Sequence, residues 1–125
     1  MSEFHFVRVV CLEDGESRFD ENPAVTMESV DFAPPAAPLD VAALGDAASV
    51  SVIRGDADWR GEAFHPAPAR QWMFVLAGTG EVRTSDGDAR EFGPGSAFLL
   101  EDTHGEGHSS EFHEETVIAV VRLAG

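Results

Sequence analysis

The sequence contains no lysine and no tyrosine, and it has a single cysteine, Cys11. Without lysine, Schiff-base chemistry and a lysine-dependent phosphate-binding loop are excluded, and without tyrosine there is no phenolic general acid. One cysteine excludes an intrachain disulfide and any metal or redox motif built from paired cysteines. Cys11 follows a valine-rich stretch, so we expect it to be a buried, small apolar residue.

Long apolar runs and positive charge are also scarce. No stretch approaches the roughly 20 apolar residues that span a bilayer, and the first residues include Glu3 and Arg8 instead of a basic leader. Eight arginines stand against 23 acidic residues, which gives a formal net charge of −15. Such a surface repels nucleic acids and anionic membranes. We therefore expect a cytoplasmic protein with neither nucleic acid nor membrane as a partner.

The chain of 125 residues is 43% hydrophobic, with nine phenylalanines and two tryptophans, which suits one domain with one core. Short apolar or alternating segments recur between glycine, proline and acidic residues, and no amphipathic helix is evident. This pattern predicts an all-β sandwich or barrel. The clearest predicted strands are Phe4–Leu12, Gln71–Leu76, Ser96–Leu100, His108–His113 and Thr116–Leu123.

The N-terminal part, residues 1–48, is less regular. Glu13–Pro23 is polar and predicts a turn, whereas Thr26–Phe32 predicts a weak strand. Residues 33–38 hold three prolines, which exclude a helix or a central strand and predict an extended arm on the domain surface. Val41–Ala48 predicts a helical turn or a loop.

Two motifs in residues 49–125 resemble those of the cupin superfamily. The first runs from His65 to Gly78, and in cupins it holds two histidines one residue apart, then a glutamate and an apolar strand that ends in glycine. The second, residues 87–100, holds Gly87 and the turn Gly93-Pro94-Gly95 before an apolar strand. The resemblance implies an all-β, cupin-type double-stranded β-helix over residues 1–125, which is a jelly-roll barrel with a small-molecule pocket at its centre.

The proline-rich arm also resembles one subgroup of small bacterial cupins. At the family's ligand positions, His65 matches the first histidine and His108 matches the last. Ala67 stands in place of the second histidine and Gln71 in place of the glutamate. His104 is a replacement candidate for a missing ligand. The resemblance therefore implies that His65, Gln71 and His108 hold a divalent metal ion such as Zn, Fe, Ni or Mn. His65 and His108 are then the candidate catalytic acid–base groups.

Further residues are candidates for ligand contact. Strand alternation places Gln71 and Met73 on one face of their strand and Trp72 on the other. We include Gln71, Met73, Trp72 and His104 as ligand-binding candidates, with core or interface packing as the alternative for Trp72. The acidic pair before His104 has two interpretations: acid–base or metal chemistry, or capping of backbone amides near Gly105 by Asp102.

Two functions remain open from the sequence. The first is a divalent-metal-dependent enzyme that acts on a small organic substrate in the barrel pocket. The second is a non-catalytic, metal-free protein that binds a small ligand. A dimerisation module is a third, weaker hypothesis, in which the Phe4–Leu12 strand or the proline-rich arm crosses to a partner, and we expect a homodimer.

Overall fold

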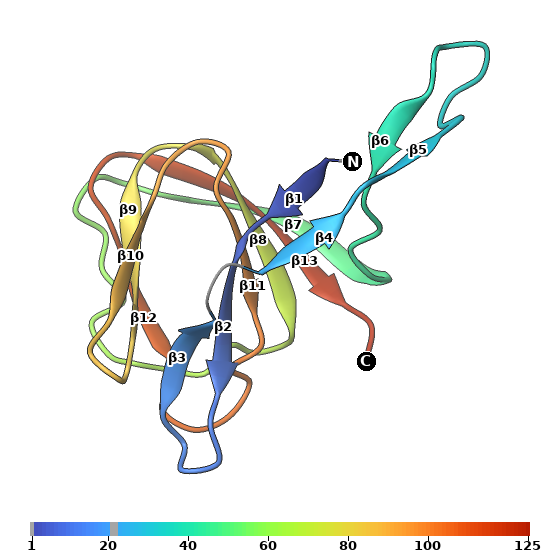
Figure 1. Ribbon diagram of the computed structural model, residues 1–125. Helices are drawn as coiled ribbons and strands as arrows, with labels where there is room; N and C mark the ends of the chain where they lie inside the picture. The colour runs from blue at the N-terminus through green and yellow to red at the C-terminus, as the bar shows by residue number, and fades with distance from the viewer. Residues whose placement is uncertain (1, 21–22) are drawn as a thin grey trace.

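The computed structural model describes residues 2–20 and 23–125 (Figure 1). The described residues form thirteen β-strands and no helix, so no helix among them is long and apolar enough to cross a membrane. The strands are β1 (Glu3–His5), β2 (Val7–Cys11), β3 (Ser17–Asp20), β4 (Ala24–Thr26), β5 (Glu28–Val30), β6 (Leu39–Val41), β7 (Ala47–Gly55), β8 (Gln71–Ala77), β9 (Gly80–Thr84), β10 (Ala89–Phe92), β11 (Ala97–Leu100), β12 (His108–Phe112) and β13 (Thr116–Leu123).

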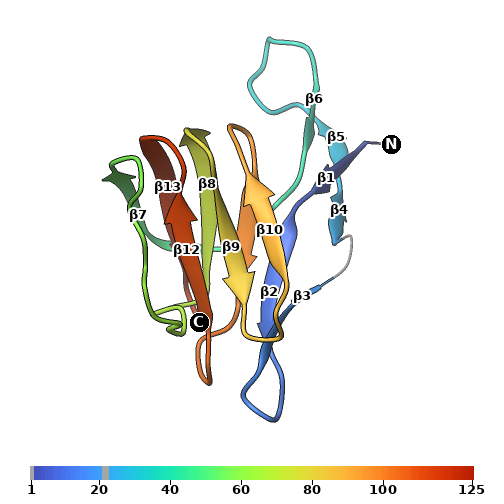
Figure 2. The same cartoon turned by 90° about the vertical axis from the view of Figure 1, so that its left-hand side faces the viewer.

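Two facing sheets make up the barrel. The larger has the order β3-β2-β11-β8-β13-β7, and the smaller, which is in front in Figure 2, has the order β10-β9-β12. Residues 60–65 extend the smaller sheet, because Arg60 and His65 bridge to Glu111 and His108 of β12. If β7 counts as the first strand and residues 60–65 as the second, β8 to β13 are the third to eighth. On this count the larger sheet has the order first-eighth-third-sixth, which is β7-β13-β8-β11. The smaller sheet has the order second-seventh-fourth-fifth, which is residues 60–65 and then β12-β9-β10. These are the strand orders of a jelly roll. The predicted all-β jelly-roll barrel is confirmed.

Strand alternation divides the apolar side chains of the larger sheet between two layers. One set faces the smaller sheet and forms the barrel core, which includes Val75, Phe98, Leu100, Ile118 and Val120. The other set faces outward and forms a second cluster of Trp72, Ala97, Leu99 and Leu123, on which Phe4 and Phe6 pack. The larger sheet is therefore apolar on both faces, unlike a sheet with one face in water.

The N-terminal strands differ from the prediction. Phe4–Leu12 is not one strand but two, since β1 pairs with β4 while β2 pairs with β3 and β11. Glu13–Pro23 was expected to be a turn, yet it contains β3, and residues 21–22 of this stretch lie outside the described residues. Ser17 and Phe19 are buried while Arg18 faces solvent. This short alternation is the sequence signal for β3, and the polar residues in it make the segment look like a turn.

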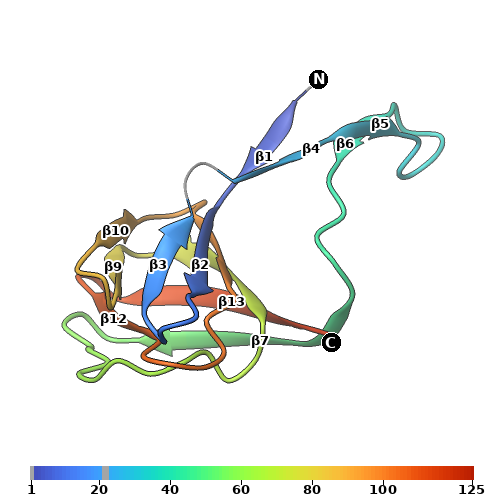
Figure 3. The same ribbon diagram turned by 60° about the horizontal axis from the view of Figure 1, so that its bottom comes forward.

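The segment around the prolines also differs. Thr26–Phe32 does not form one strand: β4 ends at Thr26, and β5 pairs with β6 to form a hairpin with the prolines at its tip. This hairpin projects from the barrel on the side away from β9, β10 and β12, so an arm along the domain surface is wrong (Figures 1 and 3). Val41–Ala48 has no helical turn and runs from the end of β6 into β7.

Candidate functional site

A cavity of about 200 Å³ lies inside the barrel. Its polar side chains are few and come from different segments: His65, Gln71 of β8, and His108 and Ser110 of β12. The remaining lining residues are Ile53, Trp59, Pro68, Met73, Val75, Val82, Phe92, Phe98, Leu100, Phe112 and Ile118. An apolar cavity with a few converging polar groups is typical of a small-molecule site.

The two cavity histidines are held together by their backbones. The N–H of each donates to the carbonyl of the other at 3.0 Å, and their imidazole ring centres are 5.0 Å apart. Gly107, directly before His108, has a φ of +74°, and a Cβ at this position would overlap the carbonyl of His65. Glycine is therefore required at position 107 for His65 and His108 to come this close.

A buried carboxylate orients His108. Nδ1 of His108 donates to Oδ2 of Asp102 at 2.6 Å, and Asp102 is fully buried. A carboxylate only accepts, so the proton of the neutral imidazole sits on Nδ1 and Nε2 keeps its lone pair. The carboxylate of Asp102 contacts His108 and not backbone amides near Gly105, so the capping interpretation is wrong. The sequence offers no spacing rule that would identify this pair.

His65 presents the same nitrogen by a different contact. Its Nδ1 lies 3.1 Å from the carbonyl oxygen of Pro66, which can only accept, so Nδ1 is the donor. The side chain of His65 is exposed, whereas His108 is buried. The two residues therefore offer two unprotonated Nε2 atoms, one near the solvent end of the cavity and one deeper within it.

Gln71 brings an unsatisfied acceptor to the cavity. The residue is buried, its Nε2 lies 3.7 Å from Sδ of Met73, and its Oε1 has no hydrogen-bond partner among the described residues. A buried polar atom without a partner costs free energy unless a ligand, an ion or water satisfies it. Arg70 faces the other way and pairs with Glu101 at 2.5 Å.

The cavity brings together four of the six predicted site residues: His65, Gln71, Met73 and His108. Trp72 faces the outer cluster instead, where its Nε1 donates to the carbonyl of Leu44 at 2.9 Å and its ring packs on Phe6. Strand alternation causes this, since Trp72 lies between two inward residues.

His104 is exposed in its loop and does not line the cavity. Trp59 does line it and packs on Phe112, with ring centres 4.7 Å apart. A tryptophan in an irregular segment carries no sequence signal for a cavity wall.

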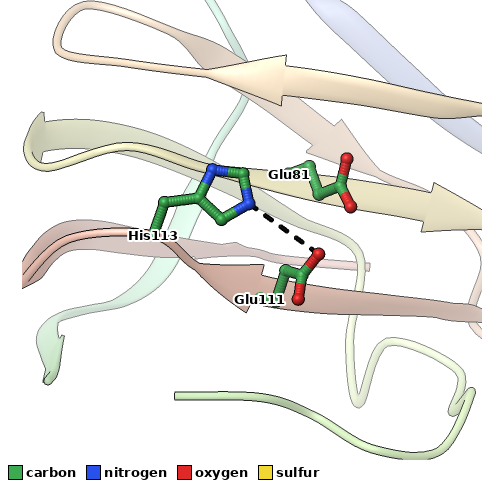
Figure 4. Close-up of side chains that lie close together, drawn as sticks. All are labelled: Glu81, Glu111 and His113. Carbon is green, nitrogen blue, oxygen red and sulfur yellow. Dashed lines mark ion pairs between the residues drawn. The ribbon is translucent and has the colours of Figure 1, made fainter. Parts of the chain in front are cut away.

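A second group of possible ligand atoms lies outside the barrel, on β9 and at the end of β12 (Figure 4). Glu81, Glu111 and His113 have ligand atoms within 4.8 Å of one another. Arg83 forms ion pairs with both glutamates, and Arg60 lies 3.6 Å from Glu111. These arginines already balance the carboxylates, so the group is an ion-pair network on the barrel surface.

The two glutamates of this network interact directly. A hydrogen bond between them raises the pKa of Glu81 and lowers the pKa of Glu111. The direction agrees with the geometry, because Arg83, Arg60 and His113 all lie near Glu111. Glu81 is therefore the member of the pair that holds a shared proton more readily.

Comparisons with known proteins find only distant likenesses in structure. No protein-family profile matches the chain, and no curated protein matches it. A solved structure of FixK2 from Bradyrhizobium japonicum is 20% identical with a TM-score of 0.44, over 59% of this chain and 39% of that chain. A structure named for ethanolamine utilization protein Q from Salmonella typhimurium LT2 is 14% identical with a TM-score of 0.47, over 98% of each chain. The strand order itself shows that this chain has a jelly-roll fold.

Proposed function

We propose that this chain is a small-molecule cupin-type protein whose cavity holds a divalent metal ion between His65 and His108 and binds a compact organic molecule beside it. The observation that carries the proposal is the convergence of two free imidazole nitrogens and one unsatisfied amide oxygen on a single apolar cavity. An enzyme that acts on a small organic substrate is the function this arrangement supports best.

The residues present fit a metal ion. Two imidazoles bound through Nε2 to one ion at about 2.1 Å have ring centres roughly 5 Å apart, which agrees with the 5.0 Å between His65 and His108. Oε1 of Gln71 is a third ligand atom. Histidine nitrogens with an oxygen ligand suit Zn, Fe, Ni or Mn. The negative charge that a glutamate ligand would supply comes instead from Asp102, through its hydrogen bond to His108.

The chain's own residues then have separate roles. Asp102 fixes the ring and the tautomer of His108, and the apolar lining limits water and selects a ligand with an apolar body. A bound ion would polarise an oxygen atom of the ligand. In the metal-free protein, Nε2 of the exposed His65 can exchange a proton between the cavity and solvent, whereas a bound ion would occupy this nitrogen.

A metal-free ligand-binding protein is the second candidate, and Gln71 favours it. Glutamine adds no charge to offset a dication, and its free Oε1 can accept a hydrogen bond from an organic N–H or O–H. This function needs only the cavity and its polar groups. It predicts that ligands raise the melting temperature of protein that contains no metal.

Metal analysis of protein purified without a histidine tag separates the two candidates. After incubation with Zn, Ni, Mn or Fe(II) and gel filtration, we expect about one ion per chain in the wild type and none in His65→Ala. His104→Ala is the matched control, because it removes an exposed histidine outside the cavity. Absence of metal from the wild type with every ion, or equal metal in His65→Ala, contradicts the metal site. Ligand-induced stabilisation that Gln71→Ala abolishes then supports the metal-free candidate.

A further inference from the structure

The barrel cavity is lined without charged side chains. None of its described lining residues is an arginine, an aspartate or a glutamate, although the chain holds eight arginines and 23 acidic residues. A carboxylate, phosphate or ammonium group that is buried beside apolar walls without an opposite charge is strongly disfavoured. The net charge of −15 adds a long-range repulsion of anions. The side chains of the cavity therefore favour a ligand without net charge.

The polar groups gather at one end of the cavity. Gln71 is the first residue of β8 and His108 is the first residue of β12, to which His65 bridges. Leu100, the last residue of β11, pairs with Gln71. The loop 101–107 then joins β11 to His108. This short connection holds Gln71 and His108 at the same end of the barrel.

This end offers hydrogen-bond acceptors and few donors. Nε2 of His65 and Nε2 of His108 each carry a lone pair, because the proton sits on Nδ1. Oε1 of Gln71 is buried and has no partner among the described residues. Ser110 also lines the cavity, but it leaves this oxygen unsatisfied. The ligand should therefore bring an O–H or N–H group to the polar end.

Aromatic rings line the opposite end. Gly80, the first residue of β9, pairs with Phe92 and with Phe112, whereas the last residue of β9 pairs with His108. A Cβ at Gly80 would stand 2.6 Å from Cζ of Phe92, so glycine leaves room for this ring. The cavity thus has a polar end and an aromatic end, and a ligand that matches it has the same division.

The rings meet one another edge to face. The centre of Phe92 is 6.1 Å from that of Phe98 and 6.2 Å from that of Phe112, with interplanar angles of 84° and 85°. Trp59 adds a fourth ring, with its centre 4.7 Å from that of Phe112. Aromatic pairs are favourable at such separations, so a further ring inside the cavity finds partners on several sides.

The volume of the cavity limits the ligand to one ring. The cavity measures about 200 Å³. An apolar cavity of roughly 150 Å³ in another protein binds benzene. The space here therefore suits one six-membered ring with a small substituent and is too small for a nucleotide or a disaccharide.

We propose that the cavity selects an uncharged, single-ring aromatic molecule with one hydroxyl group, of the phenol class. This assignment rests on the proposed function for the location of the site and adds the chemical class of the ligand. The hydroxyl donates to Oε1 of Gln71, and the ring points toward Phe98 and the aromatic end. A hydroxyl oxygen keeps its lone pairs, so the same group suits a cavity in which an ion would polarise it.

Four probes of similar size test each part of this class. Phenol has the ring and the donor and is neutral at pH 7, cyclohexanol lacks the aromatic ring, toluene lacks the donor, and benzoate carries a charge. We expect titration calorimetry of the full chain to give a dissociation constant below about 1 mM for phenol. Toluene and cyclohexanol should bind roughly three- to tenfold more weakly. Benzoate should bind at least about a hundredfold more weakly once a chelator has removed any metal that could attract it.

The two tryptophans report where phenol binds. Trp59 lines the cavity, whereas Trp72 packs in the outer cluster, where its Nε1 donates to a backbone carbonyl. In a heteronuclear NMR spectrum the indole N–H signal of Trp59 should move as phenol is added, and that of Trp72 should not. Gln71→Leu should weaken phenol binding to the level of toluene without weakening toluene binding. His104→Ala, which changes an exposed residue outside the cavity, is the matched control and should bind phenol like the wild type.

The outcomes separate this inference from the proposed function. Phenol that binds no better than toluene or cyclohexanol, benzoate that equals phenol in the metal-free protein, or a shift confined to Trp72 overturns the phenol class. The small-molecule cavity still stands if one of the other probes binds and moves the signal of Trp59. If none of the four probes binds, both the phenol class and the binding of a compact organic molecule are wrong. These measurements use the wild type, so they hold even if Gln71→Leu does not fold.

Discussion

The Asp102–His108 pair allows a quantitative prediction about stability. Both side chains are buried, and Nδ1 of His108 is the one partner found for the Asp102 carboxylate in the described part of the chain, since Oδ1 has none. Replacing His108 by alanine leaves a buried carboxylate unpaired, which costs about 3–5 kcal/mol of unfolding free energy. Further change of Asp102 to asparagine removes the buried charge. We expect Asp102→Asn/His108→Ala to recover about 2 kcal/mol of the loss.

A double-mutant cycle measures this effect, because the loss of the imidazole volume is common to both variants that lack His108. Urea unfolding of the wild type, the two single variants and the double variant, followed by tryptophan fluorescence, gives the four free energies. We expect a coupling energy of about 1.5–3 kcal/mol. Additivity within about 0.5 kcal/mol, or a double variant less stable than His108→Ala, would refute the reasoning.

Four other predictions follow from the same contacts and charges. Asp102→Asn should weaken metal binding about 10–100-fold in a competition titration with a chelator, since it weakens the hydrogen bond that orients His108. Unchanged affinity would show that Asp102 does not support the metal site. Gly107→Ala should cost more than about 2 kcal/mol because its Cβ meets the His65 carbonyl, whereas Gly87→Ala, which also has positive φ but open space, should cost about 1 kcal/mol; equal losses in urea would contradict this. Glu81→Gln should raise the melting temperature at pH 7. The raised pKa of Glu81 means that the folded state favours the neutral carboxyl, so the charged form present at pH 7 costs stability, and this cost is absent in acid. Glu111→Gln should lower the melting temperature at pH 7, because the fold favours the charged form of Glu111 and this stabilisation is lost as pH falls through its lowered pKa; shifts of the same sign would contradict the assignment.

The barrel could be predicted because its signals are local. Alternation, the Gly93-Pro94-Gly95 turn and the glycine at Gly78 mark where strands begin and end, and the observed strands follow these marks from β8 onward. The approach of His65, Gln71 and His108 to one cavity follows from the strand order once the fold is known. These features depend on neighbours in the sequence or on the fold as a whole.

The features that were missed depend on single tertiary contacts. β3 is short and polar because it uses two inward residues, and no sequence window of that size separates it from a turn. The bond between Asp102 and His108 exists because positive φ at Gly105 and Gly107 folds the loop back on itself. Nothing in the spacing of these residues specifies that path.

The most direct test of the proposed site is the position of bound metal in a crystal of the tag-free protein soaked in Zn²⁺ or Mn²⁺. We predict an anomalous difference peak inside the barrel, within ligand distance of Nε2 of both His65 and His108. A barrel without a peak, or a peak at Glu81, Glu111 and His113 on the surface in its place, would contradict it.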